Sequence, residues 1–447
     1  MSNKPKMVIL GAGESGLGSA VLALKKGYDV FVSDSGPIRE IYKDEFTRRG
    51  IPFEEGKHSV DRLMDAVEVI KSPGIPDKAP VVVKMKDAGI SVVSEIEFAG
   101  RHTNAHKVCI TGTNGKTTTT LLTYHILQKA GLNVGLAGNV GKSFAMQVAE
   151  AEHDFYVLEL SSFQLDGMFQ FRADTSILLN ITPDHLDRYE YQLSKYVESK
   201  FRILNNQRPQ DAFIYCADDP ILNDAMKDRQ VTPACYPFSI TSSEGMAAFI
   251  QNENLVINIK NQILDMSIYN LALQGKHNLY NTMAAGIAAR ILDIRKEVVR
   301  ESFADFKNAE HRLEHVMTVH GIEFVNDSKA TNVNSAWYAL ECMQKPVIWI
   351  VGGVDKGNDY ETLRELVKSK VKAIVCLGKE NTKIHEAFSD IVPDISETAS
   401  AMDAVQKSYE KGRKGDVVLL SPACASFDLF KNYEDRGWQF KTAVRSL

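Results

Sequence analysis

Short apolar runs that stop at a glycine-rich turn and lead into a helix-like segment recur along this chain. The most constraining of them is VCITGTNGKTTTTLL, residues 108–122, in which the apolar run stops at Gly112 and a lone Lys116 follows Gly115. Strand, turn and helix in this order are the repeating unit of a doubly wound sheet. The pattern therefore predicts an α/β fold built on parallel sheets.

The same stretch is typical of a phosphate-binding loop. The backbone N–H groups and the positive end of the helix face one point after the strand, and glycines let an anion approach closely. Lys116 adds a mobile positive charge, and the Thr117 hydroxyl can ligate Mg²⁺. Ile110 stands where the standard motif has its first glycine, so the loop is shorter than that form. A chance turn is the alternative, but the coincidence of all these features predicts nucleotide binding by Gly112, Thr113, Asn114, Gly115, Lys116, Thr117 and Thr118.

Polar groups follow two other apolar runs of the same section. Glu159 interrupts the apolar run FYVLEL, and a buried carboxylate needs a cation as its partner, so we predict a metal ligand rather than an exposed strand end. His185, in TPDHLDRY, follows TSILLNI, at the strand end where open sheets bind ligands. Lys200, in YVESKFRIL, is by pattern alone a solvated helix lysine.

A second glycine loop, GAGESG, occupies residues 11–16, and Asp34 lies about where a dinucleotide-binding fingerprint has its acidic residue. Alone, this signal suggests NAD or FAD, but it shows only that an anion sits at a helix N-terminus. With two such loops, one could hold ATP and the other a second phosphorylated molecule.

Composition narrows the class of protein further. The length of 447 residues predicts about three domains, and the net charge of −5 argues against a dedicated nucleic-acid binder. Six scattered cysteines without a CxxC pair argue against a disulfide framework or a zinc site. Neither a signal peptide nor an apolar run of about 18 residues is apparent, so we expect a cytoplasmic protein with no membrane span.

The apolar pattern divides the chain into three sections. We predict a Rossmann-like domain over residues 1–95, a central α/β domain that carries the phosphate loop (P-loop) over 96–308 and a second Rossmann-like domain over 309–447. Residues 255–273 alternate in polarity and predict a peripheral hairpin or small antiparallel sheet.

Over essentially its whole length, the chain resembles the Mur ligases. The motifs that carry the resemblance are, in order, GAGESG, KSPGIP, GTNGKTT, GNVG, LELSSFQL, NITPDHLDRY, GKHNLYN, HRLE, NDSKATN, GGVDKG and SPACASFDLF…RG. NDSKATN and SPACASFD indicate the member of the family that adds D-glutamate. The resemblance implies three domains, of which the first holds the UDP portion of the substrate, the central one is a P-loop ATPase and the last binds the incoming amino acid. It also implies that ATP drives the joining of D-glutamate to UDP-MurNAc-L-alanine through an acyl phosphate, in peptidoglycan precursor synthesis.

The resemblance also assigns the ATP and metal sites. It implies two Mg²⁺ ions, the first held by Thr117 and Glu159 and the second by His185 and a carbamylated Lys200. Lys116 and Lys329 join His185 and Lys200 as expected catalytic residues. The remaining expected ATP contacts are Asn278, Asn281, Arg312 and Asp327.

Substrate contacts follow from the same resemblance. Ser15, Asp34 and Gly74 match positions that contact UDP, and Asn139, Gln164 and His185 match those at the muramoyl-alanine end. The D-glutamate positions are Thr331, Lys356, Ser421 and Phe427. Two departures concern the UDP contacts: Glu14 lies in the glycine loop, and Ser35-Gly36 replaces a basic residue common in relatives.

Simpler interpretations exist for several of these residues. Arg312 and Lys356 could be surface charges, Asn281 an ordinary helix residue and Phe427 part of the core. At the level of function, an NAD-dependent oxidoreductase would explain only GAGESG and Asp34. A nucleotide-binding regulator would not need Lys116, Glu159, His185 and Lys200 together. The remaining alternative is a sister ligase that adds L-alanine. We expect a monomer whose partners are small molecules.

Overall fold

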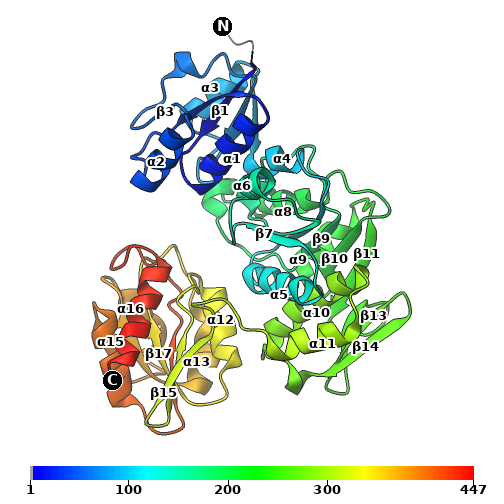
Figure 1. Ribbon diagram of the computed structural model, residues 1–447. Coiled ribbons are helices and arrows are strands. Elements are labelled where there is room, and N and C mark those ends of the chain that lie inside the picture. Colours follow the sequence, from blue (N-terminus) through cyan, green and yellow to red (C-terminus); the bar gives the residue numbers. More distant parts are fainter. Residues whose placement is uncertain (1–3) are drawn as a thin grey trace. The chain divides into compact units, whose positions relative to one another are not determined.

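A computed structural model describes residues 4–447 of the chain (Figure 1). It forms two compact units. Unit 1 comprises the chain up to Ala272 together with Asn278–Phe306, and unit 2 comprises Leu273–His277 together with Lys307–Leu447. None of the helices described over residues 4–447 has both the length and the apolar composition that crossing a bilayer requires.

The first part of unit 1 is a five-stranded parallel sheet in the order β3-β2-β1-β4-β5. The strand bounds are β1 Lys6–Leu10, β2 Asp29–Ser33, β3 Phe53–Glu54, β4 Glu68–Lys71 and β5 Ser91–Ser94. The helices are α1 Glu14–Lys25, α2 Glu40–Arg48, α3 Pro80–Asp87 and α4 Glu95–Gly100. The opening strand–turn–helix–strand unit predicted from the sequence is confirmed as β1, α1 and β2, with β1 and β2 adjacent and parallel.

The second part of unit 1 is a nine-stranded sheet in the order β14-β13-β12-β11-β10-β9-β6-β8-β7. The strands are β6 His106–Thr111, β7 Val134–Gly138, β8 Phe155–Glu159, β9 Thr175–Leu178, β10 Ala212–Cys216, β11 Ala234–Ser239, β12 Ala248–Gln251, β13 Asn254–Ile259 and β14 Gln262–Ser267. The helices are α5 Lys116–Lys129, α6 Phe144–Glu150, α7 Ser162–Leu165, α8 Leu193–Phe201, α9 Pro220–Lys227, α10 Lys276–Ile291 and α11 Lys296–Asp305. Strands β6–β12 pair in parallel.

At one edge of this sheet the pairing becomes antiparallel, because β13 and β14 form a hairpin. The alternation over residues 255–273 predicted such a hairpin, and the prediction is confirmed. Parallel strands in the sheet centre are apolar along their length because both faces are covered.

The two parts of unit 1 share one hydrophobic core. Leu17 and Ala20 of α1 belong to the same buried cluster as Phe144 and Ala145 of α6. The two helices approach so closely that a Cβ atom added at Gly18 would lie 2.0 Å from the Ser143 hydroxyl oxygen. This close packing holds the GAGESG loop beside the start of α6.

Unit 2 contains a six-stranded sheet in the order β15-β16-β20-β17-β18-β19, parallel except for the pairing of β15 with β16. The strands are β15 Glu314–Val319, β16 Ile322–Asn326, β17 Val347–Val351, β18 Val371–Leu377, β19 Ile395–Thr398 and β20 Val417–Leu420. The helices are α12 Val333–Cys342, α13 Arg364–Lys370, α14 Thr382–Phe388, α15 Ala401–Lys411 and α16 Tyr433–Arg445. Buried clusters lie on both faces of the sheet, as in a doubly wound fold.

Candidate active site

The predicted phosphate loop joins β6 to α5. Gly112 and Gly115 have φ angles of 149° and 83°, values that favour glycine, so the sequence places glycine where the backbone requires it. Gly115 immediately precedes the first residue of α5, where the helix N–H groups are unpaired within the helix. The loop thus presents a helix N-terminus with Lys116 as the first helical residue.

Asn180 fixes the shape of this loop. Its side-chain oxygen accepts a hydrogen bond from the Asn114 N–H at 2.8 Å, and its amide donates to the Asn114 carbonyl oxygen at 3.0 Å. Asn180 follows β9, the strand beside β6 in the sheet. We did not single it out from the sequence, although its position just after the apolar run TSILL was a usable signal.

Two lysines converge on the loop. Lys116 Nζ donates to the Gly112 and Thr113 carbonyl oxygens at 2.9 and 2.8 Å, and Lys200 Nζ donates to the same Gly112 oxygen at 2.7 Å. Lys200 is 1% exposed, so its interpretation as a solvated helix lysine is wrong. Burial, together with the positive charge of Lys116, holds the pKa of Lys200 well below its usual value.

Tyr196 lies one helical turn before Lys200 on α8 and is also absent from our predicted set. Its hydroxyl is 3.2 Å from the Thr113 hydroxyl, and its ring lies 5.0 Å from Lys200 Nζ. Burial raises the pKa of this phenol, so it stays neutral. One face of α8 therefore contacts the phosphate loop through both residues.

Glu159 ends β8, next to β6, and is 1% exposed. Its Oε1 accepts a hydrogen bond from the Asn139 side-chain amide at 2.9 Å. Its Oε2 is buried and has no hydrogen-bond partner among the described residues. A buried carboxylate oxygen left in this state is costly without a cation, so the structure fits a metal ligand at this position.

Helix α10 covers the other side of the loop. Asn281 is 3% exposed, and the Thr119 hydroxyl donates to its side-chain oxygen at 3.2 Å. A Cβ atom at Gly115 would lie 2.3 Å from the same oxygen. The Asn281 amide donates to the side-chain oxygen of Asn278 at 3.1 Å, so these two predicted ATP contacts lie together beside the loop.

Gln164 lies in the segment that follows β8, and His185 lies in the segment that follows β9. His185 has a left-handed backbone, with φ 52°, and its half-exposed ring packs edge-on against Phe163. Gln164 is buried in the first turn of α7, where it accepts hydrogen bonds from the N–H and the hydroxyl of Ser161. The Gln164 side-chain oxygen is therefore already hydrogen-bonded at the N-terminal cap of α7.

The GAGESG loop is tightly packed. A Cβ atom at Gly16 would lie 1.9 Å from the Gly11 carbonyl oxygen, so this position requires glycine. Asp34 accepts hydrogen bonds from the N–H groups of Ala12 and Gly36, both at 2.8 Å. Asp34 thus links the GAGESG loop to the bend after β2 that contains Gly36.

Glu14 also has a local partner. Its Oε1 accepts a hydrogen bond from the Ser143 N–H at 3.2 Å, at the start of α6. The Ser143 hydroxyl donates to the fully buried carboxyl of Glu95, whose pKa burial raises. These contacts explain how an acidic residue is accommodated in the glycine loop.

Gly74 lies in the same part of unit 1, and its carbonyl oxygen accepts a hydrogen bond from Arg188 at 3.1 Å.

In unit 2 the predicted residues divide into buried and exposed groups. Asp327 is buried and accepts hydrogen bonds from the Ser421 hydroxyl at 3.0 Å and the Leu313 N–H at 3.2 Å. Burial raises its pKa to about 7, although Arg312 and the Ser421 hydrogen bond act in the opposite direction. Lys329 Nζ lies 5.4 Å from the ring centre of Tyr433.

Thr331 is partly buried at the start of α12, whereas Lys356 is exposed. Phe427 is 71% exposed, so its alternative interpretation as a core residue is wrong. A large aromatic ring left in solvent on the SPACASFD segment is available to contact a ligand.

Three family models match the chain. They are a Mur ligase MurD-like N-terminal domain over residues 5–94, a Mur ligase middle domain over 110–289, and a Mur ligase glutamate ligase domain over 311–424. Their order agrees with the three-domain α/β architecture.

Curated relatives match the chain over almost its whole length. The chain is similar to UDP-N-acetylmuramoylalanine–D-glutamate ligases from Christiangramia forsetii, at 55% identity, and Bacteroides fragilis, at 53%. The matches cover 99% of this chain and 99% and 100% of those relatives. Among solved structures, UDP-N-acetylmuramate-alanine ligase MurC from Thermotoga maritima matches with a TM-score of 0.61 at 19% identity, covering 99% of each chain. MurF ligase from Thermotoga maritima matches with a TM-score of 0.61 at 14% identity, over 93% of this chain and 95% of that one. At this identity the two structures support the fold alone.

Proposed function

The chain belongs to the Mur ligase family, and from this membership we propose that it joins D-glutamate to UDP-N-acetylmuramoyl-L-alanine at the expense of ATP, in peptidoglycan precursor synthesis. The relatives at 53% and 55% identity are named for this ligation. The structural observation that carries the proposal is the convergence of Lys116 and Lys200 on the Gly112 carbonyl oxygen in a loop that opens a helix.

The reaction requires that a carboxylate become an electrophile. An oxygen of the L-alanine carboxylate attacks the γ-phosphorus of ATP, ADP leaves, and an acyl phosphate forms. The amine nitrogen of D-glutamate then attacks the acyl carbon, inorganic phosphate leaves, and the amine loses a proton as the amide bond forms. The first attack brings two anions together, so Lys116 and the N–H groups of the loop stabilise the charge on the phosphoryl oxygens.

We propose two Mg²⁺ sites from the family resemblance, and one structural observation supports the first of them. Oε2 of Glu159, which is buried without a hydrogen-bond partner among the described residues, supports Glu159 as a ligand of the first Mg²⁺ ion. The Thr117 hydroxyl is the other ligand that we propose for this ion. His185 and a carbamylated Lys200 are the ligands we propose for a second ion. Mg²⁺, when bound, supplies the positive charge that offsets the approach of carboxylate and γ-phosphate.

Carbamylation of Lys200 is chemically reasonable at its position. A neutral lysine nitrogen adds to the carbon of CO₂, an N–C bond forms, and one amine proton passes to solvent. The lowered pKa of Lys200 supports this step because it enriches the neutral amine. The product is an anionic oxygen ligand, which a hard cation prefers to an ammonium group.

The remaining assignments concern the substrates. We propose that Asn278, Asn281, Arg312 and Asp327 contact ATP, and that Ser15, Asp34 and Gly74 contact the UDP portion. Asn139, Gln164 and His185 would contact the muramoyl-alanine portion. Lys329, Thr331, Lys356, Ser421 and Phe427 would form the D-glutamate site, in which hydroxyls and lysines suit a dicarboxylate.

We retain residues 1–95, 96–308 and 309–447 as the proposed domain boundaries. We also propose that the protein acts as a monomer in the cytoplasm, where ATP is available. Sedimentation at micromolar concentration tests the oligomeric state.

Phosphate release tests the function. We expect ATP-dependent release only when both UDP-MurNAc-L-alanine and an amino acid are present, and a clear preference for D-glutamate over L-glutamate and L-alanine. Turnover with UDP-MurNAc and L-alanine instead would identify the sister ligase. Phosphate release without the amino-acid acceptor, or a nicotinamide absorbance change, would contradict the proposal.

A further inference from the structure

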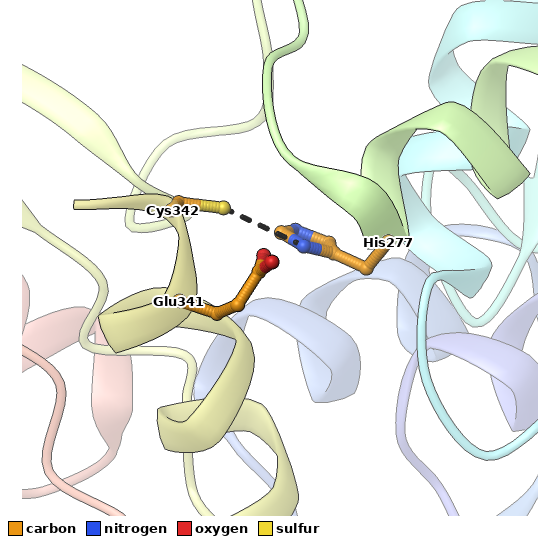
Figure 2. Close-up of side chains that lie close together, drawn as sticks. All are labelled: His277, Glu341 and Cys342. Carbon is orange, nitrogen blue, oxygen red and sulfur yellow. Dashed lines mark hydrogen bonds between the residues drawn. The ribbon is translucent and has the colours of Figure 1, made fainter. Parts of the chain in front are cut away.

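Three potential metal ligands of unit 2 lie together outside the residues assigned above: His277, Glu341 and Cys342 (Figure 2). One ligand atom from each residue lies within 4.8 Å of the others. His277 belongs to the segment Leu273–His277, whereas Glu341 and Cys342 end helix α12. The sequence pattern did not predict this cluster, because His277 is far in the chain from Glu341 and Cys342 and no CxxC pair is present.

The side chains point toward one another. Figure 2 shows the Cys342 sulfur and the Glu341 carboxylate both directed at the His277 ring. Cys342 Sγ is 3.5 Å from His277 Nδ1 and 3.8 Å from the Gln274 carbonyl oxygen. The segment packs closely here, since a Cβ atom at Gly275 would lie 2.3 Å from Cys342 Sγ.

A second observation points to a cation at this cluster. Glu341 Oε2 is buried and has no hydrogen-bond partner among the described residues. A simple thiol–imidazole hydrogen bond would explain Cys342 and His277, but it would leave this buried carboxylate oxygen unsatisfied, which is energetically costly. A cation bound by all three side chains satisfies the carboxylate as well.

The ligand set selects the class of metal. Thiolate and imidazole ligands favour borderline-soft ions such as Zn²⁺ and Co²⁺, whereas Mg²⁺ prefers oxygen alone. The thiolate and the carboxylate together would neutralise a divalent ion. Burial lowers the pKa of His277, and the Arg312 guanidinium lowers it further. Arg312 and Lys370, whose Nζ donates to the Glu341 carbonyl oxygen at 2.6 Å, are nearby cations that oppose metal binding.

We propose that His277, Glu341 and Cys342 form a site for a borderline-soft divalent transition-metal ion of the Zn²⁺ class. The ion takes the imidazole nitrogen, a carboxylate oxygen and the thiolate sulfur as three ligands of a tetrahedral site, with water in the fourth position. The thiol proton passes to solvent as the metal–sulfur bond forms. Occupancy ties the segment Leu273–His277 to the end of α12 within unit 2.

Cobalt absorption tests the site in the full-length protein, kept reduced by a phosphine. We expect Co²⁺ to produce visible tetrahedral bands and a thiolate-to-cobalt charge-transfer band that saturate at one equivalent and that Zn²⁺ removes. The Mg²⁺ site proposed above contains no sulfur and cannot produce the charge-transfer band. Cys342→Ser should abolish this band, and the matched control Cys235→Ser, at an exposed cysteine, should keep it.

Two further measurements distinguish coordination from a folding defect. Glu341→Gln preserves side-chain shape and should weaken Co²⁺ binding at least about tenfold with an unchanged thermal midpoint in metal-free buffer. Zn²⁺ should raise the thermal midpoint of the wild-type protein more than that of Cys342→Ser. Absence of the charge-transfer band in wild type, its persistence in Cys342→Ser, or unchanged affinity in Glu341→Gln would each overturn the proposal.

Discussion

Lys116 and Lys200 donate hydrogen bonds to one carbonyl oxygen, that of Gly112, at 2.9 and 2.7 Å. The first lysine belongs to the loop itself, and the second reaches it from α8. Burial of Lys200 lowers its pKa, and the positive charge of Lys116 at the same acceptor lowers it further. This arrangement supports our proposal that Lys116 binds phosphate while Lys200 can be neutral.

Replacing Lys116 with alanine should abolish ADP formation. The loss removes the charge that stabilises the phosphoryl oxygens, and we expect turnover to fall by at least about 10²–10³-fold. Lys129→Ala is the matched control because this exposed lysine lies at the other end of α5 and pairs with Asp305. Near-normal phosphate release by Lys116→Ala would refute the assignment of the loop.

Lys200→Ala should lose activity that a short-chain carboxylate partly restores. The added acid can enter the space left by the side chain and supply the oxygen ligand that the proposed carbamate would provide. Steady-state turnover with and without formate or acetate measures the rescue, with Lys195→Ala, an exposed residue of the same helix, as control. If no small carboxylate rescues the variant, the carbamate assignment is wrong, whereas the fold is unaffected.

Glu159→Gln should raise the Mg²⁺ requirement for turnover without lowering the thermal stability of the protein. We expect the Mg²⁺ concentration for half-maximal turnover to rise at least about tenfold, because an anionic ligand becomes neutral. The thermal midpoint in the absence of metal should not fall, since the substitution removes a buried carboxylate with an unsatisfied oxygen. Glu152→Gln, at an exposed position before the same strand, is the control. A fall in stability with an unchanged Mg²⁺ requirement would indicate a structural residue.

Gly16→Ala should disrupt the first glycine loop, whereas Gly13→Ala should not. A Cβ atom at Gly16 would lie 1.9 Å from the Gly11 carbonyl oxygen, but one at Gly13 would have nothing within 4 Å. We expect a loss of stability of about 1–3 kcal/mol and a raised KM for the UDP substrate in Gly16→Ala alone. Thermal unfolding and initial rates measure both effects, and equal behaviour of the two variants would contradict the loop geometry.

Asp327 should make the stability of unit 2 depend on pH. Its pKa is about 7 in the folded protein, above the ordinary value of 3.8, so the folded state binds the proton more tightly than the unfolded chain. The resulting stabilisation is complete below pH 3.8 and is lost as the pH rises through 7, with an amplitude on the order of 4 kcal/mol.

Asp327→Asn mimics the protonated carboxyl and should flatten this dependence. Thermal midpoints of the wild type and the variant between pH 5 and pH 8.5 provide the comparison, and Asp394→Asn, at a surface ion pair with Lys411, is the control. Parallel pH profiles for wild type and Asp327→Asn would show that Asp327 does not titrate in this range.

Local patterns were sufficient to predict the α/β class, the strands around both glycine loops and the hairpin formed by β13 and β14. Strand periodicity, glycine at positive φ and a lysine at a helix start are properties of short segments, so the sequence reports them directly. The hairpin of β15 with β16 was not identified, because β15 is largely exposed and lacks a continuous apolar run.

The glycine turn between β6 and α5 and the alternating α/β elements around it could therefore be predicted from short stretches of the chain. The burial of Lys200 against this turn, the hydrogen bonds of Asn180 to it and the meeting of His277 with Glu341 and Cys342 became visible only in the folded chain. Desolvation and contacts between distant segments arise from packing, which leaves no periodic signal at the residues concerned.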